Sequence, residues 1–527
     1  MAFRGLALAL VLIISRFPSC YLLSTPSSNG FFIQCLTENI PSELIFTPGS
    51  SNFTGVLVST IRNSRFLANT TTVRPICIVT ATDASHVQAA VRCGRVHGVR
   101  LRVRSGGHDY EGLSYRSTRP EETFAVVDLA NLHAITVTTT DDDGEPTAWV
   151  DSGATVGELY YAIAKNNSEL AFPAGVCTTL GIGGHFSGGG IGSMMRKYGL
   201  SVDNVVDAKL VDADGDLLEG RAAMGEDLFW AVRGGGGESF GIVVSWKVRL
   251  VKVPSTVTVL RISRTLEQGA VDAVTKWQHV GPTLPDDMNM EVLVQGRQAV
   301  FQSLYLGACD KILPTITSRL PELNATTADC NEMTWLESTA FMNFGDTNTT
   351  VLLLNRSTDP NFFKNKSDYV RRPVAKGVWL KIFTKWLAVN GSGLLILEPH
   401  GGFVGSVPTA ATPYPHRSGV LYSIQYVASW SAGDDGSVAM NWLSNFYDFM
   451  GQYVTKSPRE AYVNFRDLDI GQNTVVNDIS TFHNGKVWGE KYFGSNFQRL
   501  ATVKGKADPT DYFRNEQSIP PLLQTNN

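Results

Sequence analysis

The sequence has no excess of charge of either sign. Among its 527 residues, 45 are Lys or Arg and 49 are Asp or Glu, which gives a net charge of −4 at pH 7. A chain with this balance offers no basic face to a nucleic acid and no electrostatic attraction to an anionic membrane. We therefore predict that neither a nucleic acid nor a membrane is a partner.

Motifs of several common enzyme classes are also missing. The sequence has no Cys-X-X-Cys or His-Glu-X-X-His spacing for zinc, and no nucleophile elbow of a hydrolase. It also lacks the Gly-Lys-Ser/Thr of a phosphate-binding loop and the Gly-X-Gly-X-X-Gly of a Rossmann domain. We therefore expect no metal site, no hydrolase chemistry and no Rossmann fold.

Long apolar runs are confined to the first residues. Arg4 is followed by an apolar run over residues 5–14, which is too short to span a bilayer and is interrupted by Arg16 and Pro18. A buried first helix fits this pattern less well. Residues 1–22 are therefore predicted to be a signal peptide, and we expect a secreted protein, extracellular or in the cell wall.

Glycosylation signals and cysteines agree with an oxidising compartment. Cys20 would leave with the signal peptide, Cys35 and Cys93 could link an N-terminal arm to the first domain, and Cys309 and Cys330 are a candidate second pair. Cys77 lies in an apolar strand-like run and is interpreted as a buried free thiol. N-glycans are expected on some of eight Asn-X-Ser/Thr triplets, which begin at Asn52, Asn69, Asn166, Asn324, Asn348, Asn355, Asn365 and Asn390.

Hydrophobic periodicity divides the rest of the chain into an arm (residues 23–72), two domains (73–253 and 254–462) and a C-terminal segment (463–527). The first domain alternates strands and helices. Strands are expected at Ile76–Val79, Arg100–Arg104, Phe124–Leu129, Ala148–Asp151, Val205–Val211 and Gly241–Val251, and helices at Val87–Val96 and Val156–Lys165.

The second domain begins after Pro254, and its strands include Gly393–Leu397 and Val420–Tyr426. We predict an antiparallel sheet that covers a pocket. The C-terminal segment is predicted to be helical, with Phe493, Phe497 and Leu500 on one face and a further short helix that starts at Asp508-Pro509. The fold class is therefore α+β.

Two glycine-rich stretches carry the residues of greatest chemical interest. His108 follows Gly106 and Gly107, which let the backbone approach a flat ring closely, and Cys177 precedes the glycine-dense run from Gly181 to Gly192. Such a histidine alone is more often structural, and a solitary cysteine is more often a core residue. The pair, in this context, suggests two attachment points for a flavin.

These motifs resemble the berberine bridge enzyme-like family of plant flavoproteins, and the grass-pollen group 4 allergens within it. The resemblance rests on the run from Arg102 to Gly112, on 173–192, on Arg62-Asn-Ser-Arg65, on Asn331-Glu-Met-Thr-Trp335 and on the tail from Phe513 to Pro521. It implies a two-part PCMH-type FAD-binding domain, a substrate domain with an antiparallel sheet, and a C-terminal segment that returns to the FAD domain. It also implies the Cys35–Cys93 bridge.

In that family FAD is attached twice, to the histidine through the flavin 8α-methyl group and to the cysteine through ring carbon 6. The resemblance therefore implies covalent FAD on His108 and Cys177. It further implies a set of residues along the cofactor, which comprises Arg104, Ser105, Gly106, Gly107, Gly181, Gly183, Gly184, His185, Ser187, Gly188, Gly237, Gly241, Ile242 and Val243.

The sequence departs from the family pattern at the expected catalytic base. Where relatives have Tyr-X-Asn-Tyr-Arg-Asp, with the second tyrosine as the candidate base, this chain has Phe465, which cannot accept a proton. Ile191 replaces a tyrosine after the glycine run, and Ser423 replaces a lysine. Tyr462 is expected to pack. The candidate substitutes for the base are Tyr110, Glu398, His400 and Gln425.

The resemblance implies an FAD-dependent oxidoreductase acting on the alcohol carbon of a carbohydrate or phenylpropanoid-type small molecule, with hydride transfer to flavin N5. Leu180, three residues after Cys177, stands where a smaller valine accompanies oxidase behaviour. We therefore expect a dehydrogenase rather than an oxidase. We also expect the protein to be a monomer and its electron acceptor to be oxygen or a quinone-like compound. The alternative is a flavin-binding glycoprotein with weak or vestigial catalysis. In that case, Phe465 in place of the tyrosine would indicate that catalysis has been lost.

Overall fold

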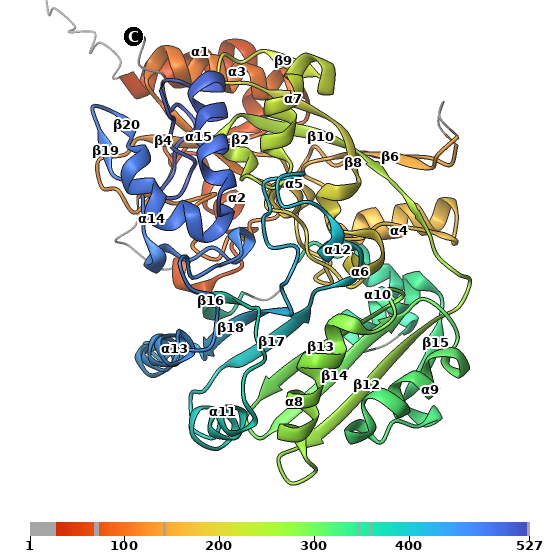
Figure 1. Ribbon diagram of the computed structural model, residues 1–527. Coiled ribbons are helices and arrows are strands. Elements are labelled where there is room, and N and C mark those ends of the chain that lie inside the picture. Colours follow the sequence, from red (N-terminus) through yellow and green to blue (C-terminus); the bar gives the residue numbers. More distant parts are fainter. Residues whose placement is uncertain (1–27, 68–72, 141–143, 346, 358–359, 524–527) are drawn as a thin grey trace, which may run out of the picture.

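The computed structural model describes residues 28–67, 73–140, 144–345, 347–357 and 360–523 (Figure 1). The predicted signal peptide and the sequon at Asn69 lie outside these residues. Among the helices described, none is both long enough and apolar enough to cross a membrane.

The first sheet has four strands, of which three are parallel and one edge strand is antiparallel. Its order is β1 (Ile45–Phe46), β2 (Ile78–Thr80), β4 (Phe124–Asp128) and β3 (Arg100–Arg104). Helix α3 (Ala84–His97) crosses from β2 to β3. Asp83 is its N-cap residue, and the side chain of Asp83 accepts a hydrogen bond from the Ser85 amide (2.8 Å). The strand predicted at Arg100–Arg104 is confirmed without a shift.

The second sheet has five antiparallel strands in the order β5 (Ile135–Thr138), β6 (Thr147–Asp151), β10 (Ile242–Arg249), β8 (Val205–Val211) and β9 (Leu217–Glu219). It packs on the first sheet, because Val211, Ile242 and Val244 share one apolar cluster with Val79 and Val127. Helices α4 (Val156–Asn166), α5 (Ile182–Ser187) and α7 (Arg221–Val232) complete this part of the fold.

The third sheet lies below the other two in Figure 1 and has seven strands, all antiparallel. Their order is β15 (Cys330–Met333), β12 (Val257–Thr265), β14 (Gln298–Tyr305), β13 (Met288–Gln295), β17 (Leu394–Pro399), β18 (Tyr422–Trp430) and β16 (Phe362–Val370). Helices α8 (Ala270–Val280), α11 (Lys376–Lys381) and α13 (Ser437–Met450) bury Trp277, Trp379 and Trp442 against one face. The predicted antiparallel sheet, and with it the α+β class, is confirmed.

The C-terminal segment, blue in Figure 1, returns to the first part of the chain through α14 (Phe482–Phe493) and α15 (Asn496–Ala507). Lys504 Nζ donates to the Ser239 carbonyl (2.7 Å), and buried Glu516 pairs with Arg102 (2.9 Å). The helix predicted at Asp508-Pro509 is wrong. Asp508 ends α15 instead, because its carboxylate accepts from Lys504 and from the amides of Tyr512 and Phe513.

The structure confirms the predictions for the cysteines but rules out one of the predicted glycosylation sites. The disulfides Cys35–Cys93 and Cys309–Cys330 are both present, and Cys77 is a buried free thiol whose pKa burial raises to about 12. Asn365, however, is fully buried, with its amide donating to the Phe465 carbonyl (3.1 Å). Asn365 is therefore not among the sequons that can carry an N-glycan in the folded protein.

Candidate active site

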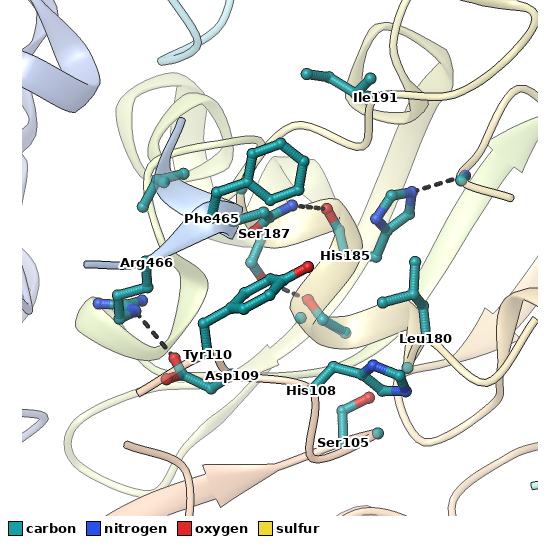
Figure 2. A pocket seen from close by; sticks show the side chains of 18 of the residues that line it. Ser105, His108, Asp109, Tyr110, Leu180, His185, Ser187, Ile191, Phe465 and Arg466 are labelled. Atoms are coloured by element: carbon teal, nitrogen blue, oxygen red, sulfur yellow. Dashed lines mark hydrogen bonds and ion pairs between the residues drawn. The ribbon is translucent and has the colours of Figure 1, made fainter. Parts of the chain in front are cut away.

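A cavity of about 480 Å³ lies between the loops of the first two sheets and side chains of the third, and Figure 2 shows some of the residues that line it. One wall consists of glycine-rich loops around 105–110, 175–193 and 236–243, and we call it the loop wall. The opposite wall consists of side chains from β13, β14, β17 and β18, and we call it the sheet wall. Residues 462–466 and 514–515 close the space between them.

His108 and Cys177 meet on the loop wall through one hydroxyl group. His108 Nε2 lies 2.9 Å from Thr179 Oγ1, and the Cys177 Sγ lies 3.6 Å from the same oxygen. Burial, with a further contribution from the Arg62 charge, lowers the pKa of His108 to about 3. The imidazole is therefore neutral at physiological pH, which is the form that can act as a nucleophile. Cys177 is exposed to the cavity.

Most of the residues predicted to follow the cofactor line this cavity. They are Ser105, Gly106, Gly107, Gly181, Gly183, Gly184, His185, Ser187, Gly188, Gly241, Ile242 and Val243. Gly237 begins a short 3-10 helix (Gly237–Ser239) between Gly236 and Glu238, which both line it.

Arg104 is the exception in the predicted set. Its side chain is fully buried away from the cavity, where it forms an ion pair with Asp128 and donates to the carbonyls of Val56 (2.7 Å) and Leu57 (2.6 Å). A buried guanidinium needs such partners to offset its lost hydration. The side chain of Arg104, which was predicted to lie along the cofactor, therefore does not reach the cavity.

Several polar side chains of the loop wall hold the loops themselves. His185 Nε2 accepts a hydrogen bond from the Gly175 amide (3.0 Å), and burial lowers the pKa of this histidine to about 4. Ser105 Oγ donates to the Ser152 carbonyl (2.6 Å), and Ser187 Oγ donates to the Gly183 carbonyl (2.6 Å). These bonds fix the loop that carries Cys177 and the helix behind it.

The glycines of the loop wall fit a large flat group bound against the backbone. A Cβ atom at Gly184 would meet no heavy atom within 4 Å, although this residue lines the cavity. At Gly181 a Cβ would lie 2.1 Å from Ser105 Oγ and 2.2 Å from the Gly106 nitrogen. Gly181 therefore permits the two loops to touch, and Gly184 leaves free the space in front of them. The wall is suited to the flavin that the sequence predicts.

Arg466 ties the loops to the C-terminal segment. Its guanidinium pairs with Asp109 (2.9 Å, Figure 2) and with Glu238 (2.8 Å), so that three distant segments meet beside the cavity. Asp109 directly follows His108 in the chain. The ion pairs therefore fix the position of the predicted attachment loop.

Aromatic rings close one side of the cavity (Figure 2). Tyr110 and Tyr462 each pack edge-on against Phe465, with ring centroids 6.0 Å and 5.0 Å from it. Gln425 Nε2 donates to Tyr110 Oη (2.8 Å), and burial raises the pKa of Tyr110 to about 12. Tyr110 therefore keeps its proton at neutral pH, and Gln425 orients the hydroxyl. The amide of Gln425 is not a base.

Tyr462 does more than pack. Its hydroxyl oxygen accepts hydrogen bonds from the amides of Gly190 (3.0 Å) and Ile191 (3.3 Å) and from Asn464 Nδ2 (2.9 Å). The ring is buried at the same time. Tyr462 therefore positions the end of the glycine run, and with it Ile191, which lines the cavity.

The sheet wall contains Glu398 together with three polar residues that sequence reasoning missed. Asn289 Nδ2 donates to Glu398 Oε1 (2.7 Å), and Gln302 Nε2 donates to Glu291 Oε1 (2.9 Å). All four side chains line the cavity. A signal was present, because Asn289 and Glu291 alternate with buried Met290 and Val292 along β13, which places two polar residues on one face of an apolar strand.

His400 does not reach the cavity. It is fully buried, with Nε2 2.9 Å from Tyr414 Oη, and burial lowers its pKa to about 3. The residue follows Glu398 by two positions, but β17 ends at Pro399 and the chain turns away. The prediction of His400 as a substitute base is therefore wrong. No group of three or more metal-binding side chains was found in the described residues.

The comparisons with known proteins agree with the fold. The model for an FAD-binding domain matches residues 75–221, and the model named "Berberine and berberine like" matches residues 461–520. These matches define an FAD-binding oxidoreductase. The chain belongs to the berberine bridge enzyme-like family, because it is 54% identical to berberine bridge enzyme-like Cyn d 4 from Cynodon dactylon over 527 residues, 99% of each chain.

Solved structures of the family superpose closely. Phl p 4, described as a grass pollen allergen with glucose dehydrogenase activity, is 52% identical, with a TM-score of 0.91 over 94% of this chain and 100% of its own. A variant of it with valine in place of one isoleucine is described as a glucose oxidase. A berberine bridge enzyme variant described as a reticuline dehydrogenase is 36% identical, with a TM-score of 0.87 over 94% and 100% of the two chains.

Proposed function

We propose that the protein holds FAD through two covalent links, one to His108 and one to Cys177. The observation that carries this proposal is their convergence on Thr179, which brings a neutral imidazole and an exposed thiol to the same wall of one cavity. Gly184 leaves the space in front of that wall open. Ser105, Gly106 and Gly107 on one side and 181–188 on the other hold the cofactor.

The reaction is the oxidation of an alcohol carbon of a carbohydrate or phenylpropanoid-type substrate. When bound, FAD supplies the hydride acceptor, ring atom N5. The alcohol proton must leave during or near this step, and the chain must therefore orient the alcohol and receive the proton. Tyr110, held by Gln425, remains protonated and is suited to donate a hydrogen bond to the substrate oxygen. Glu398, the remaining predicted base, lines the sheet wall, but burial and the neighbouring Glu291 raise its pKa well above the ordinary value, so it too holds a proton.

We propose dehydrogenase rather than oxidase activity. Leu180 lines the cavity on the loop wall, close to His108 in Figure 2, and its amide donates to the Cys177 carbonyl (3.3 Å). The side chain is larger than valine. The descriptions of Phl p 4 support the proposal, since the wild-type protein is called a glucose dehydrogenase and the valine variant a glucose oxidase.

The protein is proposed to be a secreted glycoprotein. Two disulfides support an oxidising compartment, and the relatives include pollen allergens. Five sequon asparagines are exposed and available for N-glycans, namely Asn52, Asn166, Asn324, Asn355 and Asn390.

Acid precipitation of the purified protein tests the covalent attachment. The wild type and the His108→Ala and Cys177→Ala variants should each keep yellow flavin in the pellet, while the double variant should release it. Retention by the double variant would refute the attachment sites. Anaerobic addition of sugars and alcohols then separates an enzyme, whose flavin bleaches, from a vestigial flavin-binding glycoprotein, whose flavin stays oxidised.

A further inference from the structure

Four polar side chains form a continuous row across the sheet wall. The strand register pairs Gln302 with Glu291 and Glu398 with Ser423, and the pairing of Val292 with Leu397 brings Glu291 beside Glu398. The row thus crosses β14, β13, β17 and β18, and every member lines the cavity. Such a row lies opposite the loop wall, on the side from which a substrate would face the flavin.

The two carboxyl groups at the centre of the row form a pair that shares one proton. Burial raises the pKa of both groups, and the neighbouring Glu291 raises that of Glu398 further. Glu291 is the member that stays ionised, because it accepts hydrogen bonds from Glu398 and from Gln302 (2.9 Å). Two carboxylates in contact do not both ionise at neutral pH, so the proton resides on Glu398.

Asn289 independently indicates a ligand site, because one of its buried polar atoms has no hydrogen-bond partner among the described residues. This residue is 4% exposed, its Nδ2 is used by Glu398, and its Oδ1 is buried without a hydrogen-bond partner among the described residues. Buried amide oxygens are rarely left unsatisfied. Asn289 lines the cavity, so a hydroxyl group of a ligand that reaches this oxygen would supply the missing partner.

We propose that Glu291, Glu398 and Asn289 recognise a polyhydroxylated substrate, with the Glu291 carboxylate and the Asn289 oxygen each accepting a hydrogen bond from a different hydroxyl group. Two acceptors side by side require a ligand with two neighbouring donors, as a sugar has and a simple alcohol lacks. The inference rests on the proposed function and selects carbohydrates from its two substrate classes. A negatively charged sugar acid would be repelled by Glu291.

The binding test uses reduced holoenzyme, which has no oxidised flavin to turn the ligand over. Dissociation constants for D-glucose and for coniferyl alcohol would be measured by ligand-observed NMR. Glu291→Gln should weaken glucose binding by at least ~10-fold, since it removes a charged acceptor, whereas Glu398→Gln should weaken it by only ~3-fold, because an amide still donates to Glu291. Binding of coniferyl alcohol should hardly change. The exposed Glu121→Gln is the matched control.

The outcomes separate this inference from the function on which it rests. Unchanged glucose affinity in Glu291→Gln would overturn the role of the carboxyl pair and leave the proposed oxidoreductase intact. Binding of coniferyl alcohol, or of the amine reticuline, but not of glucose by the wild type would overturn the carbohydrate substrate and this inference together. A larger loss in Glu398→Gln than in Glu291→Gln would refute the assignment of the proton.

A second measurement needs no ligand and covers the case in which Glu291→Gln does not fold. The infrared spectrum of the wild type at pH 7 should contain the carbonyl band of a protonated carboxylic acid that disappears in Glu398→Gln. Persistence of that band in the variant would contradict the shared proton. Circular dichroism and covalent flavin content establish that each variant has folded.

Discussion

The two walls of the cavity are built in different ways. The loop wall takes its shape from backbone, with glycines in close contact at Gly106 and Gly181 and with two reactive side chains, His108 and Cys177, at its surface. The sheet wall takes its chemistry from side chains on neighbouring strands, each placed by cross-strand register. The first wall is suited to a fixed cofactor and the second to a substrate that varies among relatives.

The walls also differ in what stabilises them. Buried ion pairs hold the C-terminal segment in place, with Arg466 paired to Asp109 of the loop wall (2.9 Å) and Glu516 paired to Arg102 of strand β3 (2.9 Å). The sheet wall rests on a large apolar cluster that includes Trp277 and Trp379. A strong fall in pH should therefore weaken the ion pairs of the C-terminal segment, and changes in side-chain size or polarity on the sheet wall should alter substrate binding.

The largest effect is expected from a base restored between the two walls. Phe465→Tyr adds a phenol in the cavity, edge-on to Tyr110 and Tyr462. A positioned proton acceptor contributes ~100-fold or more, so anaerobic flavin reduction by a sugar should accelerate by ~100-fold. Phe363→Tyr is the control, since Phe363 also packs on Tyr110 (5.5 Å) but does not line the cavity. An unchanged rate would show that another residue already accepts the proton.

Acid should loosen the attachment of the C-terminal segment through Glu516. Its pairing with Arg102 and the amide of Thr118 holds the folded-state pKa at about 2, below the ordinary 4.5. This contribution to stability, up to about 3 kcal/mol, is complete above pH 4.5 and is lost as the pH falls toward 2. The melting temperature of the wild type should therefore fall steeply over this range. Glu516→Gln should flatten the fall, and an equally steep curve in that variant would disprove the assignment.

Two glycines of the loop wall should respond differently to one added methyl group. Gly181→Ala forces a Cβ to within 2.2 Å of two atoms and should destabilise the fold by about 1–3 kcal/mol. Gly184→Ala meets nothing within 4 Å, so the protein should fold normally, but the methyl group enters the cofactor space and should lower the flavin content. Thermal unfolding and flavin absorbance measure both effects. Full flavin loading in Gly184→Ala would place the cofactor elsewhere.

The smallest expected effect is on the rate at which oxygen reoxidises the reduced protein. Leu180→Val removes one methylene from the loop wall next to Cys177 and should speed reoxidation of the reduced protein in air-saturated buffer by a factor of several, with little change in flavin reduction. Ile191→Val, also in the cavity lining, should show no such gain. Stopped-flow absorbance measures the rate. Fast reoxidation of the wild type with no gain in Leu180→Val would contradict the proposed dehydrogenase behaviour.

The comparison of the walls explains what the sequence alone can predict. The loop wall is contiguous in sequence, so the runs around His108 and Cys177 predicted it almost completely. Arg104 was assigned to it wrongly, because sequence does not show which way a strand residue points when both faces of the strand are buried. Strand and helix positions in the first domain were equally local and largely correct.

The sheet wall required knowledge of register. Glu291 and Glu398 are more than one hundred residues apart, and only the pairing of β13 with β17 brings them together. His400 was an equal candidate in sequence, but the chain leaves the sheet after Pro399 and buries this histidine against Tyr414. Buried Asn365 shows the same limit, since a sequon does not reveal that its asparagine belongs to a buried strand.

Mass spectrometry of a proteolytic digest tests the central claim most directly. If one flavin is bound by both residues, the peptide that contains His108 and the peptide that contains Cys177 should be recovered as a single species whose mass is their sum plus one FAD, less the hydrogens lost on linkage. In His108→Ala only the Cys177 peptide should carry the flavin, and in Cys177→Ala only the His108 peptide. Recovery of both wild-type peptides unmodified, or of flavin on any other peptide, would contradict the account.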